Sequence, residues 1–200
     1  MILPSRGPTA QAPTHQPAQR WGPHHLRLHR HLLRHPELLP ERATLLLALS
    51  GGQDSMALLA LLHDLGRLHH WSLQLWHGDP RWRVDSGHQA AELERWTGGL
   101  GLSLHIDTWE PAAARSHPNP RTEASAREWR YGQLEARARA VGASHVVTAH
   151  TASDRAETLL LHLARGSHRR GLASLRHQRP LGSGAGDSAP ILLTRPLLTF

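Results

Sequence analysis

A short polar segment, residues 50–55, carries the residue types that hold phosphate groups in proteins. It lies between an apolar run and a segment of helical periodicity, so the sequence predicts a turn from a buried strand into a helix. Two adjacent glycines let the backbone approach a phosphate closely, and the following helix N-terminus offers unpaired N–H groups. Two serines add hydroxyl donors. The predicted phosphate-binding residues are Ser50, Gly51, Gly52, Gln53, Asp54 and Ser55.

Asp54 is an unusual residue for a site that binds only anions, because its carboxylate repels phosphate. A Mg²⁺ ion that bridges the carboxylate and a phosphate removes this conflict. Alternatively, Asp54 only stabilises the N-terminus of the predicted helix. We interpret it as a candidate metal ligand and catalytic residue.

A second polar segment, residues 150–158, contains Asp154 and Glu157 three positions apart, and therefore on one face of a helix. Stabilisation of the helix N-terminus is one interpretation. The segment also follows a predicted strand, and helix N-termini after parallel strands face the crevice where open α/β sheets bind ligands. We therefore interpret Asp154 and Glu157 as candidate catalytic carboxylates. Asp154 is also a candidate Mg²⁺ ligand, and His150 a candidate substrate contact.

The long helix predicted over residues 122–141 has an apolar stripe that turns charged toward its N-terminus. The stripe consists of Tyr131, Leu134, Ala138 and Val141. Continued backward at steps of three or four, it reaches Arg127 and Glu123. Glu123, Arg127 and Arg130 are therefore candidate contacts to phosphate or substrate; a surface ion pair between Glu123 and Arg127 is the alternative.

A basic turn, Arg165-Gly166-Ser167, ends the last predicted helix. As a helix C-cap it requires only Gly166. As a functional loop, Arg165, Gly166 and Ser167 could contact phosphate or nucleotide. Both interpretations stay open.

The composition excludes several kinds of chemistry. The chain has no Cys and no Lys, and all 23 basic residues are Arg. Disulfides, cysteine nucleophiles, lysine Schiff bases and a Walker-type phosphate loop are thereby excluded. A net charge of +7 suits a polyanionic partner such as RNA, although a codon bias toward Arg would have the same effect. A His-rich segment, residues 24–35, predicts a basic helix with Leu26, Leu32 and Leu33 turned inward rather than a metal site.

Predicted strands and helices alternate from residue 44 onward, which indicates an α/β fold. We expect an open, mainly parallel five-stranded sheet with helices on both faces. Residues 1–20 predict a disordered tail, and residues 21–200 one catalytic domain. No apolar run is long enough for a membrane span, so we expect a cytoplasmic protein. The predicted strands are 44–49, 73–76, 102–106, 145–149 and 190–193; the helices are 54–67, 86–100, 122–141 and 153–165; loops are expected at 110–120 and 182–188.

Several stretches of the chain, taken in order, resemble the tRNA-isoleucine lysidine synthetase family. They cover roughly residues 44–198 and read LLLALSGGQDSMALLALL, WHGDPRWRVDS, TEASAREWRYGQLE, HTASDRAETLLLHLARGS with RRGL, and RPLL. The first stretch is common to ATP pyrophosphatases, whereas the ordered set is much more specific. The resemblance implies an adenine nucleotide alpha hydrolase-like fold. Members of the family usually continue into further tRNA-binding regions, so we expect this catalytic domain to lack C-terminal parts.

The resemblance also implies a reaction. ATP adenylylates O2 of the wobble cytidine in an isoleucine tRNA with a CAU anticodon, and pyrophosphate leaves. The ε-amine of free L-lysine then attacks C2 and displaces AMP. On this resemblance, residues 50–55 would bind ATP. Mg²⁺ binding or proton removal would fall to Asp54, Asp154 and Glu157. Contacts to phosphate or tRNA would come from Arg127, Arg130 and Arg165. A homodimer is compatible with the sequence.

Three alternatives stay open at this point. A tRNA thiolation enzyme fits poorly, because such enzymes rely on cysteines. A synthetase that amidates a small acid, such as NAD or GMP synthetase, does not account for the basic charge. A non-catalytic, Arg-rich RNA-binding module does not account for the intact phosphate segment and its paired carboxylates. ATP–pyrophosphate exchange with and without tRNA, and transfer of labelled lysine to tRNA, would separate them.

Overall fold

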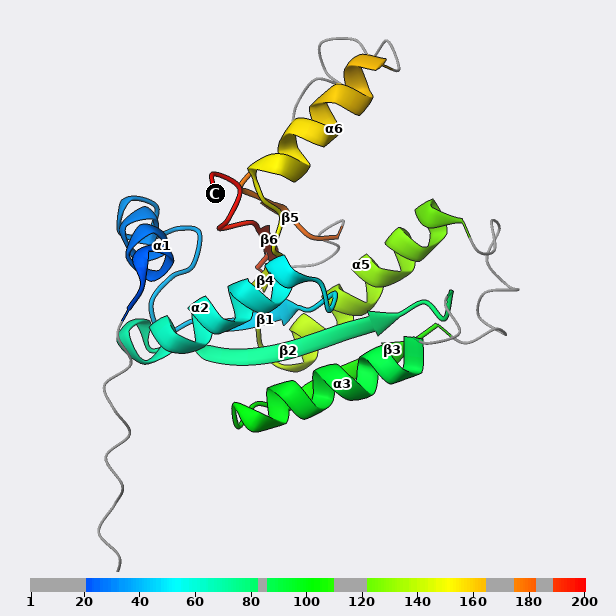
Figure 1. The fold of residues 1–200 in the computed structure, drawn as a ribbon, viewed down its shortest axis with the longest axis horizontal. Coiled ribbons are helices and arrows are strands. Elements are labelled where there is room, and N and C mark those ends of the chain that lie inside the picture. The colour runs from blue at the N-terminus through cyan, green and yellow to red at the C-terminus, as the bar shows by residue number, and fades with distance from the viewer. Residues whose placement is uncertain (1–20, 83–85, 110–121, 165–174, 183–188) are drawn as a thin grey trace, which may run out of the picture.

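The computed structural model describes residues 21–82, 86–109, 122–164, 175–182 and 189–200. The predicted tail, the predicted loop at 110–120 and most of the loop at 182–188 lie outside these ranges. The described part is an α/β structure built on one sheet (Figure 1). Among the described helices, none combines the length and apolarity needed to cross a bilayer.

The sheet has six strands in the order β3-β2-β1-β4-β6-β5. All neighbours pair in parallel except β5, which runs antiparallel to β6 at the edge. The predicted fold class is confirmed, but the predicted number of strands was one too few. The strands are β1 (Thr44–Ala48), β2 (Ser72–Asp79), β3 (Leu104–Thr108), β4 (His145–Val147), β5 (Gln178–Pro180) and β6 (Leu192–Thr194).

The sequence prediction missed β5 because it has no apolar pattern. It contains Gln, Arg and Pro, and a proline is tolerated at a sheet edge, where no neighbour needs its missing N–H. β2 is also longer than predicted and includes His77, Gly78 and Asp79, which pair with the end of β3. Both differences arise from pairing with a neighbouring strand, which local sequence does not reveal.

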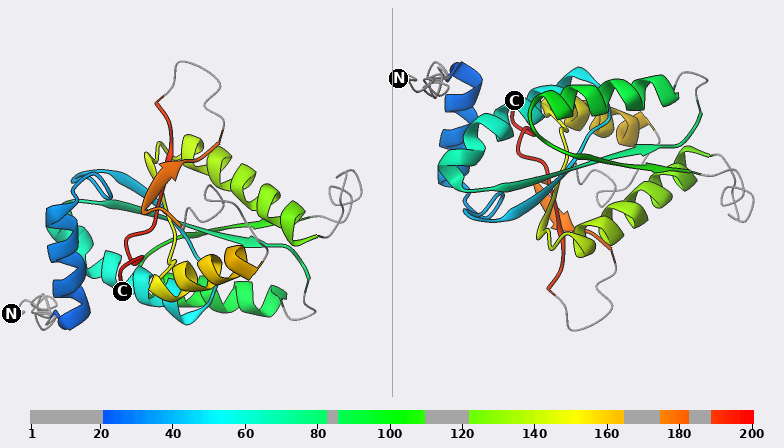
Figure 2. Two further views of the ribbon diagram at one scale, coloured as in Figure 1. Left: turned by 90° about the horizontal axis from the view of Figure 1, so that it is seen from above. Right: turned by 90° about the horizontal axis from the view of Figure 1, so that it is seen from below.

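Helices cover both faces of the sheet, with α2 and α3 on one face and α5 on the other (Figure 2). The apolar run of β1 serves both faces. Leu45 and Leu47 pack into a cluster with α1 and α2, while Leu46 packs with α5 residues such as Leu134 and Ala138. The helices are α1 (Pro23–Arg34), α2 (Gln53–His69), α3 (Ser86–Gly99), α5 (Glu123–Ala140) and α6 (Ala152–Ala164).

The predicted helix at residues 24–35 is present as α1, but its inward face was predicted only in part. Leu32 is buried as expected, and Leu28 rather than Leu26 or Leu33 lies beside it in the core. Leu26 and Leu33 are 40% and 62% exposed. The two buried leucines are four residues apart, and this spacing places them on the face of α1 that contacts α2.

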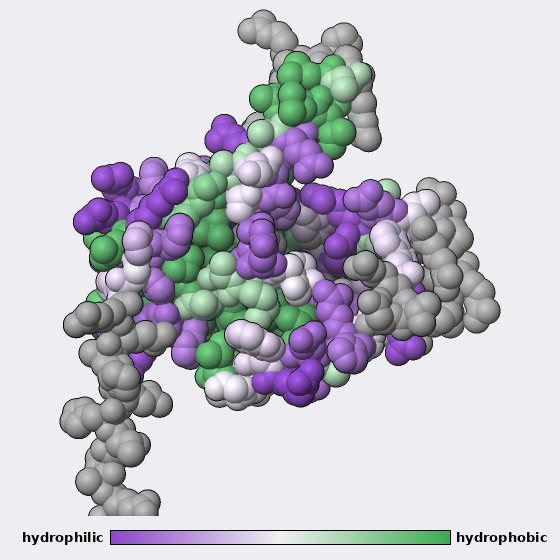
Figure 3. Space-filling view, viewed as in Figure 1, coloured by the Kyte–Doolittle hydropathy of each residue, from purple (hydrophilic) through white to green (hydrophobic). Residues whose placement is uncertain are grey.

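α6 differs from the other helices because it has no buried residue. It projects away from the sheet (Figure 1), and hydrophobic side chains gather on it (Figure 3). These side chains are Leu159, Leu160, Leu161 and Leu163.

Candidate functional site

A cavity of about 610 Å³ lies at the carboxyl ends of β1, β2 and β4. β1 pairs with β2 on one side and with β4 on the other. The direction of the chain connections reverses here, which is where open α/β sheets bind their ligands. The lining includes the polar residues Ser50, Gln53, Asp54, Ser55, His77, Asp79, Gln89, Arg127, Arg130, Thr148, His150 and Asp154.

The predicted phosphate turn connects β1 to α2 and is held by its own hydroxyl groups. Ser50 Oγ lies 3.2 Å from Ser55 Oγ and accepts the N–H of Gly52 at 3.3 Å. Ser55 Oγ donates to the carbonyl oxygen of Gly52 at 2.8 Å. Gly52 is the N-cap of α2, and no side chain caps this helix. The first N–H groups of α2 are therefore available to an anion.

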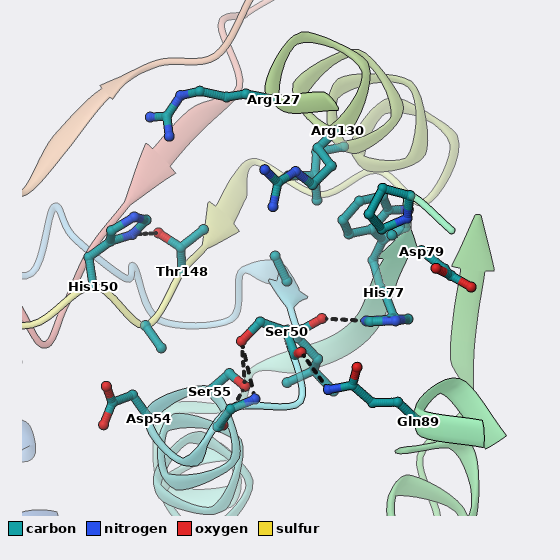
Figure 4. A pocket seen from close by; sticks show the side chains of 18 of the residues that line it. Ser50, Asp54, Ser55, His77, Asp79, Gln89, Arg127, Arg130, Thr148 and His150 are labelled. Carbon is teal, nitrogen blue, oxygen red and sulfur yellow. Dashed lines mark hydrogen bonds between the residues drawn. The ribbon is translucent and has the colours of Figure 1, made fainter. Parts of the chain in front are cut away.

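Gly51 is at a position where a side chain does not fit. Its φ is +80°, in the left-handed region that glycine tolerates best. A Cβ at this position would lie 2.5 Å from Nε2 of Gln89. Gln89 comes from α3, and its Nε2 donates to the carbonyl oxygen of Ser50 at 3.4 Å (Figure 4). A neighbouring helix therefore positions the turn, and this contact was not predicted.

Two of the three predicted catalytic carboxylates, Asp54 and Asp154, line the same cavity. Asp54 is exposed in the first turn of α2. Asp154 Oδ2 accepts the backbone N–H of Thr151 at 2.7 Å and its hydroxyl at 3.1 Å. Asp154 therefore stabilises the start of α6 and also faces the ligand space. Glu157 is exposed and lies outside the cavity lining.

The cavity offers donors of the kind that Mg²⁺ uses. The ion is usually held by one or two carboxylates together with substrate phosphates and water. Asp54 and Asp154 supply two carboxylates beside the phosphate turn. The described residues contain no group of three or more potential protein ligands. The residues therefore fit an ion that is held jointly by the two carboxylates and a phosphate group bound at the turn.

His150 and Thr148 follow β4 and contact each other, with Thr148 Oγ1 3.0 Å from His150 Nδ1 (Figure 4). Burial is the largest influence on His150 and lowers its pKa below the ordinary value. Arg195 and Arg127 lower this pKa further, while Asp154 opposes them. The imidazole is therefore kept neutral near pH 7, with Nε2 free of this hydrogen bond.

Of the three charged residues predicted at the N-terminal end of the α5 stripe, two line the cavity and one does not. Arg127 and Arg130 line the cavity, and both project from α5 in Figure 4. Glu123 is exposed in the first turn of α5 and lies outside the lining. The alternative interpretation, a surface ion pair between Glu123 and Arg127, is not present among the described contacts. Arg165, Gly166 and Ser167 fall outside the described residues.

The end of β2 supplies four lining residues that sequence reasoning did not identify, which are Trp76, His77, Gly78 and Asp79. His77 is buried, and its Nδ1 donates to the carbonyl oxygen of Leu49 at 2.8 Å, since a carbonyl can only accept. Asp79 Oδ1 accepts the N–H of Arg81 at 2.8 Å and so holds the turn after the strand. Trp76 forms an apolar wall and donates to Asp107 at 2.7 Å. The stretch WHGDPRWRVDS drew attention to this segment through its resemblance to a family, but the sequence did not predict that β2 continues to Asp79.

Comparisons with known proteins agree with this geometry. A family model described as a PP-loop domain matches residues 25–200. The chain is 54% identical over 180 residues to the tRNA(Ile)-lysidine synthase of Parasynechococcus marenigrum (strain WH8102), covering 90% of this chain and 51% of that protein. It is 50% identical over 180 residues to the tRNA(Ile)-lysidine synthase of Synechococcus sp. (strain ATCC 27144), with the same coverage. The chain thus spans about half the length of these curated relatives.

A solved structure supports the fold alone. The U34-tRNA thiolase NcsA from Methanococcus maripaludis superposes with a TM-score of 0.68 at 13% sequence identity. The match covers 88% of this chain and 58% of the thiolase.

Proposed function

Because the chain belongs to the PP-loop domain family, we propose that it is the catalytic domain of an ATP-dependent ligase that forms lysidine in an isoleucine tRNA. ATP transfers its adenylyl group to O2 of the wobble cytidine of the CAU anticodon, and pyrophosphate leaves. The ε-amine of free L-lysine then attacks C2, AMP leaves, and one proton is released. The similarity to two tRNA(Ile)-lysidine synthases at 50% identity or more supports this assignment.

The observation that carries the proposal is the convergence of two predicted segments on one cavity. The phosphate turn at Ser50–Ser55 and the segment with His150 and Asp154 are about 100 residues apart in sequence, and both line it. In the proposal, the turn holds the pyrophosphate part of ATP through its N–H groups and hydroxyls. Arg127 and Arg130, on the opposite side, contact the phosphates or the tRNA.

The carboxylates of Asp54 and Asp154 would hold Mg²⁺, which supplies positive charge to the phosphates as pyrophosphate leaves. The lysine amine, with an ordinary pKa of about 10.4, must lose a proton before it attacks. Asp154 and Glu157 are proposed to take part in this proton removal. Burial lowers the pKa of His150, which favours the neutral imidazole, and its Nε2 is proposed to form a hydrogen bond with the substrate, as donor or acceptor according to the tautomer.

The deciding experiment measures incorporation of labelled lysine into an unmodified isoleucine tRNA transcript with ATP and Mg²⁺. We expect incorporation that depends on ATP, with AMP and pyrophosphate as products. A transcript with a changed anticodon serves as the control. ATP–pyrophosphate exchange without lysine transfer would point instead to another synthetase. RNA binding with neither activity would point to a non-catalytic module.

A further inference from the structure

The ring of Tyr131 holds two guanidinium groups that come from distant parts of the chain. Arg127, one helical turn earlier on α5, places its Cζ 4.9 Å from the ring centre. Arg179, on the edge strand β5, places its Cζ 5.0 Å from the same centre. Cation–π attraction favours both positions. The ring thus contacts both arginines and connects α5 to the edge of the sheet.

Arg195 brings a third positive charge to this cluster. It follows β6 directly, is 1% exposed, and donates from Nη1 to the carbonyl oxygen of Arg176 at 2.8 Å. Its Nε has no hydrogen-bond partner in the part of the chain that the structure describes. Burial lowers the pKa of Arg195, Tyr131 opposes this change, and Arg179 and Arg127 reinforce it.

No ion pair joins Arg127, Arg179 or Arg195 to a described carboxylate. Like charges held close together repel one another, and charges removed from water are stabilised when an opposite charge binds beside them. Guanidinium groups bind phosphate in a planar, bidentate geometry. The cluster is therefore suited to a phosphate group from outside the chain.

The position of the cluster separates it from the phosphate turn. Arg127 and Tyr131 line the cavity, whereas Arg179 lies outside the lining. Arg127 and the turn with Ser50 lie on opposite sides of the cavity in Figure 4. A phosphate between Arg127 and Arg179 would lie at the cavity edge beside β5, away from the turn that suits the phosphates of ATP. An RNA backbone that enters the cavity from this edge would bring a phosphate to the arginines and leave the turn free for ATP.

We propose that Arg127, Tyr131 and Arg179 form a clamp for a backbone phosphate of the RNA whose base enters the cavity; this proposal rests on the proposed function. Tyr131 keeps the two arginines in place before the RNA arrives. Arg195, behind them, is a positioning residue that adds charge to the clamp. The proposal assigns a substrate-binding role to β5, a strand without any apolar pattern.

The test compares Arg179→Gln with Arg67→Gln in the 200-residue chain. Arg67 is exposed near the C-terminal end of α2 and lies outside the cavity lining. Each variant loses one positive charge, so Arg67→Gln controls for the change in net charge. Binding of an unmodified tRNA transcript is measured from about 0.05 to 0.3 M salt without ATP or lysine. For Arg179→Gln we expect affinity about five- to tenfold lower at 0.1 M salt, and a salt slope smaller by about 1. Arg67→Gln should bind like the parent.

ATP and lysine affinities are measured in parallel to identify the anion. An unchanged Kd for ATP and an unchanged KM for lysine support the clamp. A selective rise in the Kd for ATP would assign the arginine to nucleotide phosphate, and a selective rise in the KM for lysine to its carboxylate; either result overturns the proposal. So do equal RNA affinities for the two variants, or a parent that binds no RNA at low salt. Melting curves confirm that Arg179→Gln is folded, and Arg179→Lys should recover part of the RNA affinity.

RNA binding and lysine transfer fail separately in this design. A parent that binds RNA through Arg179 but transfers no lysine would contradict the proposed function and leave the clamp intact. If the parent and Arg179→Gln transfer lysine at equal rates at subsaturating tRNA, the result would contradict the clamp and leave the proposed function intact.

Discussion

The side chain of Gln89 donates from Nε2 to the carbonyl oxygen of Ser50 over 3.4 Å, so the helix after β2 positions the phosphate turn after β1. The same amide occupies the space where a Cβ of Gly51 would lie, 2.5 Å from Nε2. Two conditions therefore apply to Gly51. It must adopt a φ of +80°, and it must leave room for the amide of Gln89.

These two conditions predict how substitutions at the turn combine. Gly51→Ala should weaken ATP binding strongly, because it both strains the backbone and displaces Gln89. Gln89→Ala removes one hydrogen bond and should raise the Kd for ATP by about two- to tenfold. In the double variant, the contact with the amide is gone and only the backbone strain remains. The loss of ATP binding free energy in the double variant should therefore be smaller than the sum of the losses in the two single variants. Titration with a fluorescent ATP analogue measures all four proteins. Strict additivity would contradict the positioning role of Gln89.

Asp54→Ala should abolish tRNA modification and leave the fold intact. Asp54 is exposed in the first turn of α2, so its loss should cost only about 0.3–1 kcal/mol of stability. Asp54 and Asp154 both line the cavity, where the proposed Mg²⁺ would bind. Circular dichroism and labelled-lysine incorporation are compared with the parent and with Glu92→Ala. Glu92 is an exposed carboxylate on α3 outside the lining. Full activity of Asp54→Ala would remove this residue from the mechanism.

The sequence predicted those parts of the site that depend on strand order along the chain. The phosphate turn and the segment with Asp154 each follow an apolar strand, and parallel strands bring their carboxyl ends to one edge. The prediction could not show that β1 and β4 are direct neighbours. That arrangement depends on the sheet order, which no local pattern contains.

The residues that were missed depend on tertiary contacts. His77 and Asp79 are in a strand only because β2 continues to pair with β3 beyond its apolar run. Gln89 looks like an ordinary polar residue of an amphipathic helix until α3 is placed beside the turn. Arg179 belongs to a strand that an antiparallel partner creates. In each case the side chain is unremarkable in sequence, and its neighbour decides its role.

A histidine pair between α1 and α2 predicts a loss of stability in mild acid. His29 Nδ1 lies 3.2 Å from His69 Nε2, and His69 is stacked on Trp71 at 4.4 Å. Burial, followed by His29, lowers the pKa of His69 from its ordinary 6.5, and Glu41 opposes this. The folded pKa is lower than the unfolded one, so the stabilisation is complete above pH 6.5. It is lost as the pH falls toward the folded pKa.

We therefore expect the urea concentration at the unfolding midpoint to decrease when the pH is lowered from 7.5 to 5.5. His69→Phe removes the titrating group and should reduce this fall, provided that its midpoint at pH 7.5 confirms folding. His88→Gln, at an exposed position on α3, should keep the dependence of the parent. An identical fall in His69→Phe would assign the effect to other groups, of which His31 is one, because burial and the nearby His35 and His177 lower its pKa as well.

Asp154→Asn separates catalysis from helix capping at the start of α6. Asparagine keeps an oxygen for the N–H of Thr151, which Asp154 now accepts at 2.7 Å, but removes the charge. A capping role alone predicts a loss of about 0.3–1 kcal/mol of stability and nearly full activity. We expect instead a single-turnover rate of lysine transfer about 10²-fold lower, with a nearly unchanged melting temperature. Glu157→Gln, outside the cavity lining, should lower the rate less. A rate within threefold of the parent for Asp154→Asn would leave this carboxylate with helix capping alone.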